Sequence, residues 1–184
     1  MRKIGNRRCL VTAATLLFLC AVGFGAFFGC NSAVVGQTLG PSESVIRART
    51  VTDNMQTIMA MLRNHGKIRF RVEIIPGGAR TINTSADPAI AKMLQIHAAD
   101  MRLRMQQDVS IRPNDPLFQE LLKHHSEVRM KITDVQDGVI EDETSANPQV
   151  TLLIRAHTKT VAEFVEYGLP RAQQPSPLPK GYRP

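Results

Sequence analysis

Residues 65–108 read HGKIRFRVEIIPGGARTINTSADPAIAKMLQIHAADMRLRMQQD, and residues 125–168 read HSEVRMKITDVQDGVIEDETSANPQVTLLIRAHTKTVAEFVEYG. The two stretches align without a gap at an offset of sixty residues, and eight of the forty-four positions are identical. The identical pairs are His65 and His125, Arg69 and Arg129, Gly78 and Gly138, Thr84 and Thr144, Ser85 and Ser145, Ala86 and Ala146, Pro88 and Pro148, and His97 and His157. The similarity extends back over 54–108 and 114–168, so one supersecondary unit is expected twice.

Each copy predicts a helix, a hairpin and a second helix. Residues 67–74 alternate strictly, which is typical of a half-buried strand. The apolar members, Ile68, Phe70, Val72 and Ile74, are expected to face the core. Gly77-Gly78 and Asp137-Gly138 predict two-residue hairpin turns. Asp87-Pro88 and Asn147-Pro148 predict the starts of the two long helices, because Asp and Asn cap helices and proline is favoured at the first helical position.

The predicted fold class is α+β. A lone two-stranded hairpin is marginal in water. Two hairpins joined edge to edge form a four-stranded antiparallel sheet, with the helices on one face and a pseudo-twofold axis between the copies. Repeat unit 1 spans 53–108 and repeat unit 2 spans 109–168, and together they form one domain. Residues 169–184 contain five prolines in sixteen residues and are predicted to be a disordered tail.

The N-terminal segment 1–30 resembles an export signal. Four basic residues precede Cys9–Gly29, an uncharged and mostly apolar run. Three outcomes stay open: lipidation of Cys30 after Gly29, retention as a membrane anchor, or cleavage after a small residue such as Gly36. In each, the body is exported to the periplasm or the outer face of a bacterial membrane, with residues 31–52 as a tether.

Charge and cysteine content exclude several partners. The formal net charge is +7, but residues 1–30 carry four of the 23 basic residues and no acidic ones, which leaves +3 for the rest. No charge run suited to a phosphate backbone remains, so no nucleic-acid partner is expected. All three cysteines lie at or before Cys30, so the body has no disulfide, cysteine nucleophile or iron–sulfur site.

The histidines are the leading candidate ligands. His97 and His157 interrupt the apolar stripes of the two long helices, and His65 and His125 form a second repeated pair. A buried imidazole needs a partner for its N–H. One interpretation is a core histidine bonded to a hydroxyl or carbonyl. The other is a metal or haem iron held between paired histidines near the pseudo-twofold axis.

Other repeated or clustered residues have structural explanations. Methionine is frequent in the body and can bind Cu(I) outside the cytoplasm, but methionines at helical spacing usually fill a core. Arg69 and Arg129 lie on a basic strand face that is either an anion-binding surface or a solvated one. Thr84-Ser85 and Thr144-Ser145 end a strand and begin a helix cap. No nucleophile–base pair or carboxylate dyad is recognisable, so the protein is not expected to be an enzyme.

The residues His65, Arg69, Thr84, Ser85, Pro88 and His97, with their equivalents sixty positions later, resemble a group of small exported bacterial proteins of uncharacterised function. The resemblance covers about 54–168. It implies an association with redox or cytochrome systems and no known activity. This chain departs from the pattern in having Thr158 where the first copy has Ala98.

Together these observations predict a non-enzymatic binding or scaffolding module of the bacterial cell envelope. Its partners would be the membrane, through the N-terminus, and an unknown protein. No cofactor is required by this interpretation. The alternative is a redox-linked protein that binds haem or copper through its paired histidines.

Overall fold

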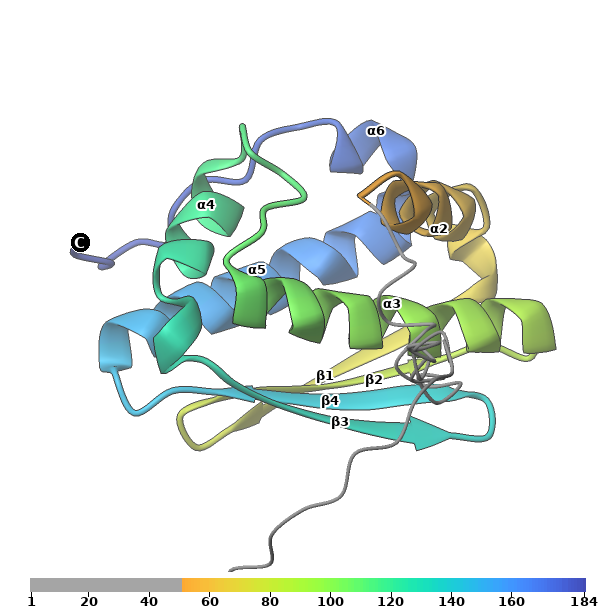
Figure 1. The fold of residues 1–184 in the computed structure, drawn as a ribbon, viewed down its shortest axis with the longest axis horizontal. Helices are drawn as coiled ribbons and strands as arrows, with labels where there is room; N and C mark the ends of the chain where they lie inside the picture. The colour runs from red at the N-terminus through yellow and green to blue at the C-terminus, as the bar shows by residue number, and fades with distance from the viewer. Residues whose placement is uncertain (1–50) are drawn as a thin grey trace, which may run out of the picture. The chain divides into compact units, whose positions relative to one another are not determined.

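The computed structural model describes residues 51–184 (Figure 1). The predicted export segment, Cys30 and nearly all of the predicted tether lie outside these residues. The elements, in chain order, are α2 (Val51–Arg63), η1 (His65–Lys67), β1 (Arg69–Ile75), β2 (Gly78–Thr84), α3 (Pro88–Gln107), α4 (Pro116–Lys123), η2 (His125–Glu127), β3 (Arg129–Val135), β4 (Gly138–Thr144), α5 (Pro148–Tyr167) and α6 (Leu169–Ala172).

The duplicated unit is confirmed. Between η1 and the end of α3, every element has a counterpart with the same bounds shifted by sixty residues. The copies differ at their first helices. After the shift of sixty residues, α2 still begins more than one helical turn before the position that matches the start of α4. The predicted caps are also present: Asp87 and Asn147 each accept a hydrogen bond from a backbone N–H in the first turn of the long helix, and Pro88 and Pro148 begin the helices.

The two hairpins join into one antiparallel sheet in the order β1-β2-β4-β3. The register of the central strands pairs Gly78 with Thr144 and Thr84 with Gly138, so the pseudo-twofold axis passes beside the pair Thr81–Glu141. The pairing continues symmetrically past the strand ends. The N–H of Ser85 donates to Asp137 O at 2.8 Å, and the N–H of Ser145 donates to Gly77 O at 2.9 Å.

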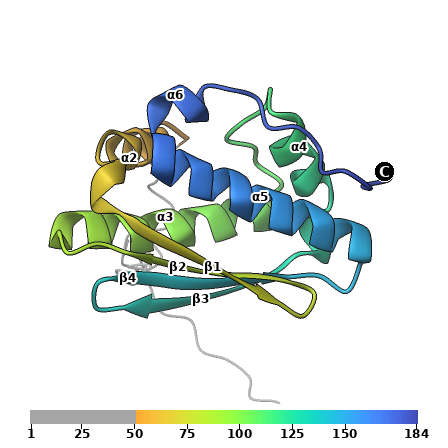
Figure 2. The same cartoon turned by 180° about the vertical axis from the view of Figure 1, so that it is seen from behind.

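All helices cover the same face of the sheet, as predicted (Figures 1 and 2). The two long helices are exchanged between the copies, because α3 lies mainly on β4 and α5 lies on β1 and β2. Gln95 of α3 donates to Val135 O at 2.9 Å and to Gly138 O at 3.2 Å. Arg155 of α5 reaches the equivalent carbonyls of the first hairpin, at 3.3 and 3.4 Å. Neither copy therefore buries its own hairpin alone.

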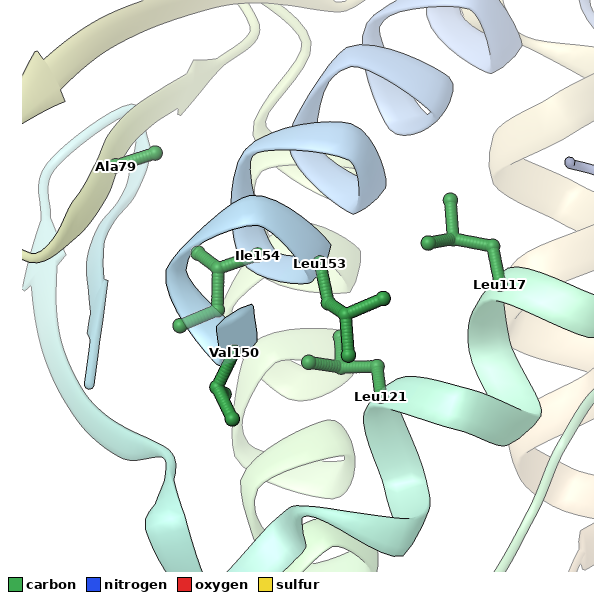
Figure 3. Close-up of a cluster of buried hydrophobic side chains, with 6 residues drawn as sticks. All are labelled: Ala79, Leu117, Leu121, Val150, Leu153 and Ile154. Atoms are coloured by element: carbon green, nitrogen blue, oxygen red, sulfur yellow. The ribbon is translucent and has the colours of Figure 1, made fainter. Parts of the chain in front are cut away.

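The hydrophobic core follows this exchange. One cluster joins Ala79 of β2 to residues of the second copy (Figure 3); its members are Ala79, Leu117, Leu121, Val150, Leu153 and Ile154. The other joins Val139 of β4 to residues of the first copy; its members are Met61, Ile90, Leu94, Ala98 and Val139. Since Ala79 and Val139 are equivalent in the repeat, each copy supplies one sheet residue to the other copy's helices.

The hairpin turns lie one residue earlier than predicted. Ile75 pairs with Gly78, which makes Pro76 and Gly77 the turn residues, and Val135 likewise pairs with Gly138. Gly77 has φ +72°, the value that the third residue of a type II turn requires. Gly78 and Gly138 belong to the strands, and their role is different: it depends on the close approach of β2 and β4.

Two residues predicted in the core face are exposed. Val72 is 37% exposed and Ile74 is 63% exposed. Both lie toward the hairpin end of β1, which is an edge strand, so they have a paired neighbour on one side alone. Phe70, at the other end of the same face, is partly buried as predicted.

The predicted disordered tail is wrong, because residues after Gly168 form α6 and then pack along α4. Ser176 is fully buried. Its N–H donates to Asp115 Oδ2 at 3.0 Å, and its carbonyl accepts from the N–H of Leu117 at 3.2 Å. Farther on, the Tyr182 hydroxyl donates to Glu120 Oε1 at 2.7 Å. Proline richness here reflects an extended chain held by specific hydrogen bonds rather than a flexible one.

We predict that Gly78→Ala and Gly138→Ala each lower the free energy of unfolding by about 2–4 kcal/mol. A Cβ at Gly78 would lie 1.8 Å from Glu143 O, and one at Gly138 would lie 1.9 Å from Asn83 O, so either methyl group forces β2 and β4 apart. Gly66→Ala is the matched control, since nothing lies within 4 Å of its added Cβ, and it should change stability by less than about 1 kcal/mol. Urea unfolding measures all three. Equal effects at the three sites would contradict this account.

Candidate ligand cavity

A cavity of about 410 Å³ lies between the inner face of the sheet and the helices. Most of its lining is apolar and comes from α2, α3, α4, α5 and both outer strands. Six methionines belong to the lining: Met55, Met59, Met61, Met101, Met105 and Met130. The methionines predicted to fill a core thus surround a space, where their flexible thioethers can adapt to an occupant.

The sheet contributes a polar floor to this apolar cavity. We define the polar floor as the inward-facing side chains Thr81, Asn83, Glu141 and Glu143, all from the central strands β2 and β4. Because side chains alternate along a strand, these residues share the inner face with the core residues Ala79 and Val139. The floor therefore sits at the pseudo-twofold axis, under the middle of the helix layer.

Asn83 links two other side chains of the polar floor by hydrogen bonds. Its Nδ2 donates to Glu141 Oε1 at 2.8 Å and to Thr81 Oγ1 at 3.2 Å, which uses both amide protons. The residue is 6% exposed. Within residues 51–184 its Oδ1 is buried without a hydrogen-bond partner. Since most buried polar groups are paired, Asn83 Oδ1 is a candidate acceptor for a water molecule or a ligand.

Glu141 has an unusual protonation equilibrium. Burial, and next the nearby charge of Glu143, raise the pKa of Glu141 to about 7 from its ordinary 4.5. The charge of His157 and the hydrogen bond from Asn83 act in the opposite direction but are weaker. The carboxyl is thus partly protonated at neutral pH, and it can either donate or accept a hydrogen bond.

His157 lies between the helix layer and the floor. Its Nδ1 is 3.5 Å from Glu143 Oε2, and its ring meets the ring of Phe118 edge to face with centroids 4.9 Å apart. Burial alone would lower the pKa of the imidazole, but the negative charges of Glu143 and Glu141 outweigh it and raise the pKa. Its charge therefore stabilises the fold at low pH, and this stabilisation is lost as the pH rises through the raised pKa.

Two arginines also line the cavity, and both are engaged by the protein. Arg104 donates to Asn54 Oδ1 from Nε at 2.7 Å and also from its Nη2, and Asn54 in turn donates to Asp100, so α2 is fixed on α3. Arg112 donates to Asp115 Oδ2 at 3.0 Å and to Ala172 O at 2.7 Å.

Aromatic rings hold the second of these arginines in place. The guanidinium of Arg112 lies 5.0 Å from the ring centroids of Phe118 and of Phe164. These contacts hold the loop before α4 against α4 and α5 beside the cavity.

The four candidate histidines lie in different surroundings. His97 and His157 both line the cavity. They are half-buried rather than fully buried, because they face this space. His65 also lines the cavity, but its Nδ1–H donates to Val165 O at 2.8 Å and its ring packs on Gly168, so it closes the end of α5. His125 begins η2 and lies outside the lining.

The structure does not bring Arg69 and Arg129 together. They are exposed on β1 and β3, the two outer strands, and their pairing partners Thr84 and Thr144 lie at opposite ends of the central ladder. Three strand spacings alone separate them by about 14 Å. Whether either arginine binds an anion stays a prediction, and each would do so separately. Among residues 51–184, no group of three or more candidate metal ligands occurs, and no helix has the length and apolar character needed to span a membrane.

Asn83, Glu141 and Glu143 were missed from the sequence. One sequence signal could have found them. The second strand of each hairpin, β2 and β4, carries polar residues at alternate positions, where a core-facing strand would carry aliphatic ones. Such a pattern is also what a solvated strand shows. It identifies a buried polar floor only once β2 and β4 are known to be central.

The fold and the site define a two-repeat α+β protein with a largely apolar internal cavity and a polar floor. Comparisons of the chain with profiles of protein families, with curated protein sequences and with solved structures found no match. The functional argument therefore rests on the cavity residues themselves.

We predict that Glu141→Gln stabilises the protein at pH 8 and not at pH 4.5. The pKa of Glu141 is raised on folding, so the folded state disfavours its ionised form, and stability falls as the pH rises from about 4.5 through 7. Glutamine keeps the acceptor for Asn83 and cannot ionise. The expected gain in unfolding free energy at pH 8 is about 2 kcal/mol. Urea unfolding at both pH values tests this, with the exposed Glu166→Gln as control. A gain of the same size at both pH values would show that ionisation is not the cause.

Proposed function

We propose that the protein is a non-enzymatic ligand-binding module of the bacterial cell envelope, attached to the membrane through its N-terminus, and that its cavity holds a predominantly apolar small molecule. The observation that carries the proposal is the cavity of about 410 Å³ at the centre of the fold. Pockets for small molecules typically measure about 300–1,000 Å³ and are lined mainly by apolar side chains with a few placed polar groups.

The lining suits an apolar occupant. A bound ligand contacts these apolar side chains and stabilises the folded state through mass action. The six methionines suit a binding surface that adapts to its ligand, since their side chains are unbranched and polarizable.

We predict that Val161→Phe, which projects a larger ring into the cavity, weakens binding of an apolar probe at least tenfold. Val161 belongs to the lining, whereas Val72 lies outside it on the same domain, so Val72→Phe is the matched control and should leave binding unchanged. The probe is N-phenyl-1-naphthylamine, followed by fluorescence with the full chain in lipid nanodiscs and empty nanodiscs as background. Circular dichroism confirms folding of each variant. Equal binding by Val161→Phe and the wild type would place the probe elsewhere.

The attachment to the envelope has its own test. Intact mass and lipid labelling of membrane fractions are expected to show an exported chain, with Cys30 lipidated if the lipoprotein alternative holds. A full-length, unlipidated chain confined to the cytoplasm would refute export. This result is independent of what the cavity binds.

A second candidate function is haem or metal binding, and one observation favours it. His97 and His157 are equivalent in the repeat, and both line the same cavity. The Nδ1 of His157 faces Glu143, and a carboxylate behind a histidine is the usual support of a metal ligand. Absorption spectra and metal analysis of the purified chain decide this: a haem or copper signal lost in both His97→Gln and His157→Gln supports the candidate. A colourless, metal-free chain that binds the apolar probe excludes it.

A further inference from the structure

Asn83 presents an unpaired acceptor on the polar floor. It commits both amide protons to Thr81 and Glu141. Its buried Oδ1 has no hydrogen-bond partner within residues 51–184. The Nδ1 of His157 is likewise without a hydrogen-bond partner there and lies 3.5 Å from Glu143 Oε2. A ligand group that pairs with Asn83 Oδ1 must bring its own hydrogen.

The charges around the floor lead to the same conclusion. Two carboxyls, Glu141 and Glu143, face one imidazole, so the negative groups of the floor outnumber the positive one. Each of the two arginines of the lining is matched by an aspartate: Arg112 donates to Asp115, and Arg104 donates to Asn54, whose amide in turn donates to Asp100. A ligand carboxylate placed here would stand beside two glutamates in a space of low polarity, where repulsion is poorly screened.

We propose that the ligand is an amphiphile whose polar end is an uncharged or cationic hydrogen-bond donor, a hydroxyl or an amine, bound by Asn83 Oδ1 and the carboxyl of Glu141, and that anionic amphiphiles such as fatty acids are excluded. This inference rests on the proposed binding function and specifies the chemistry of its ligand. The apolar body of the ligand lies among the methionines, and its head lies at the pseudo-twofold axis.

The experiment uses four probes with the same eight-carbon chain: octan-1-ol, octylamine, octanoate and octane. Each displaces N-phenyl-1-naphthylamine from the full chain in nanodiscs at pH 7.5, with empty nanodiscs as background. The alcohol and the amine are expected to bind at least tenfold more tightly than octanoate. The alcohol should also exceed octane, since octane leaves Asn83 Oδ1 unpaired.

Two variants connect this preference to the floor. Glu141→Gln is expected to improve octanoate binding at least fivefold while changing octane binding less than twofold, because it removes a negative charge without changing the cavity volume. Asn83→Leu removes the open acceptor, so the alcohol should lose its advantage over octane. Asn83→Ala serves the same purpose if the leucine variant does not fold.

The possible outcomes separate the two proposals. If none of the probes, including N-phenyl-1-naphthylamine, binds the wild-type chain, the binding function itself is overturned and this inference with it. If octanoate binds as tightly as the alcohol and the amine, the cavity binds amphiphiles but the inference about the head group is wrong. Unchanged ratios in Glu141→Gln and Asn83→Leu would also overturn it, since the preference would then arise away from the floor.

Discussion

The antiparallel pairing of β2 with β4 is the interaction on which the rest of the structure depends. It converts two marginal hairpins into one sheet and places the pseudo-twofold axis beside Thr81 and Glu141. One of the repeated identities is explained at this contact. Glycine is required at 78 and 138, because the facing backbone leaves no room for a Cβ. Ser85 and Ser145 extend the pairing to the opposite turns.

The exchange of the long helices follows from the same pairing and produces the cavity. Since α3 covers β4 and α5 covers β1 and β2, the helices bury Ala79 and Val139 at two separate clusters. Between these clusters the sheet presents polar side chains, which cannot pack against an apolar helix face without a loss of solvation. The space over the polar floor is therefore where the two halves of the core fail to meet.

The fold was predictable from the sequence because its signals are local and occur twice. Alternation in 67–74, the Asp-Pro and Asn-Pro helix starts and the sixty-residue offset each specify an element, and the burial argument joins them. The site was not predictable in the same way. Asn83 and Glu141 are buried only because their strands are central in the sheet. In the sequence alone, a polar residue in a weakly patterned strand is equally well explained by exposure to solvent. The two histidines were identified because a polar residue in an apolar helix stripe is itself anomalous.

The tail and the strand ends show the limit of compositional reasoning. Five prolines after Gly168 suggested disorder, yet one buried backbone at Ser176 and its partner Asp115 hold that segment on α4. Composition gives the average cost of ordering a chain, whereas the outcome depends on whether a few buried hydrogen bonds offset that cost. Asp115 precedes Pro116 and caps α4, where its side chain accepts from the N–H of Phe118. That its second oxygen also holds the tail is a tertiary contact, which no local pattern encodes.

Divergence between the two copies makes the floor of the cavity asymmetric. Duplication supplies each position twice, and the equivalents at the floor have become different: Thr81 corresponds to Glu141, and Asn83 to Glu143. One side of the axis is consequently acidic and pairs with His157, while the other is neutral and presents an open acceptor. A symmetric cavity would bind an amphiphile in two equivalent orientations. The unequal floor removes this degeneracy, because its two sides offer a ligand different groups.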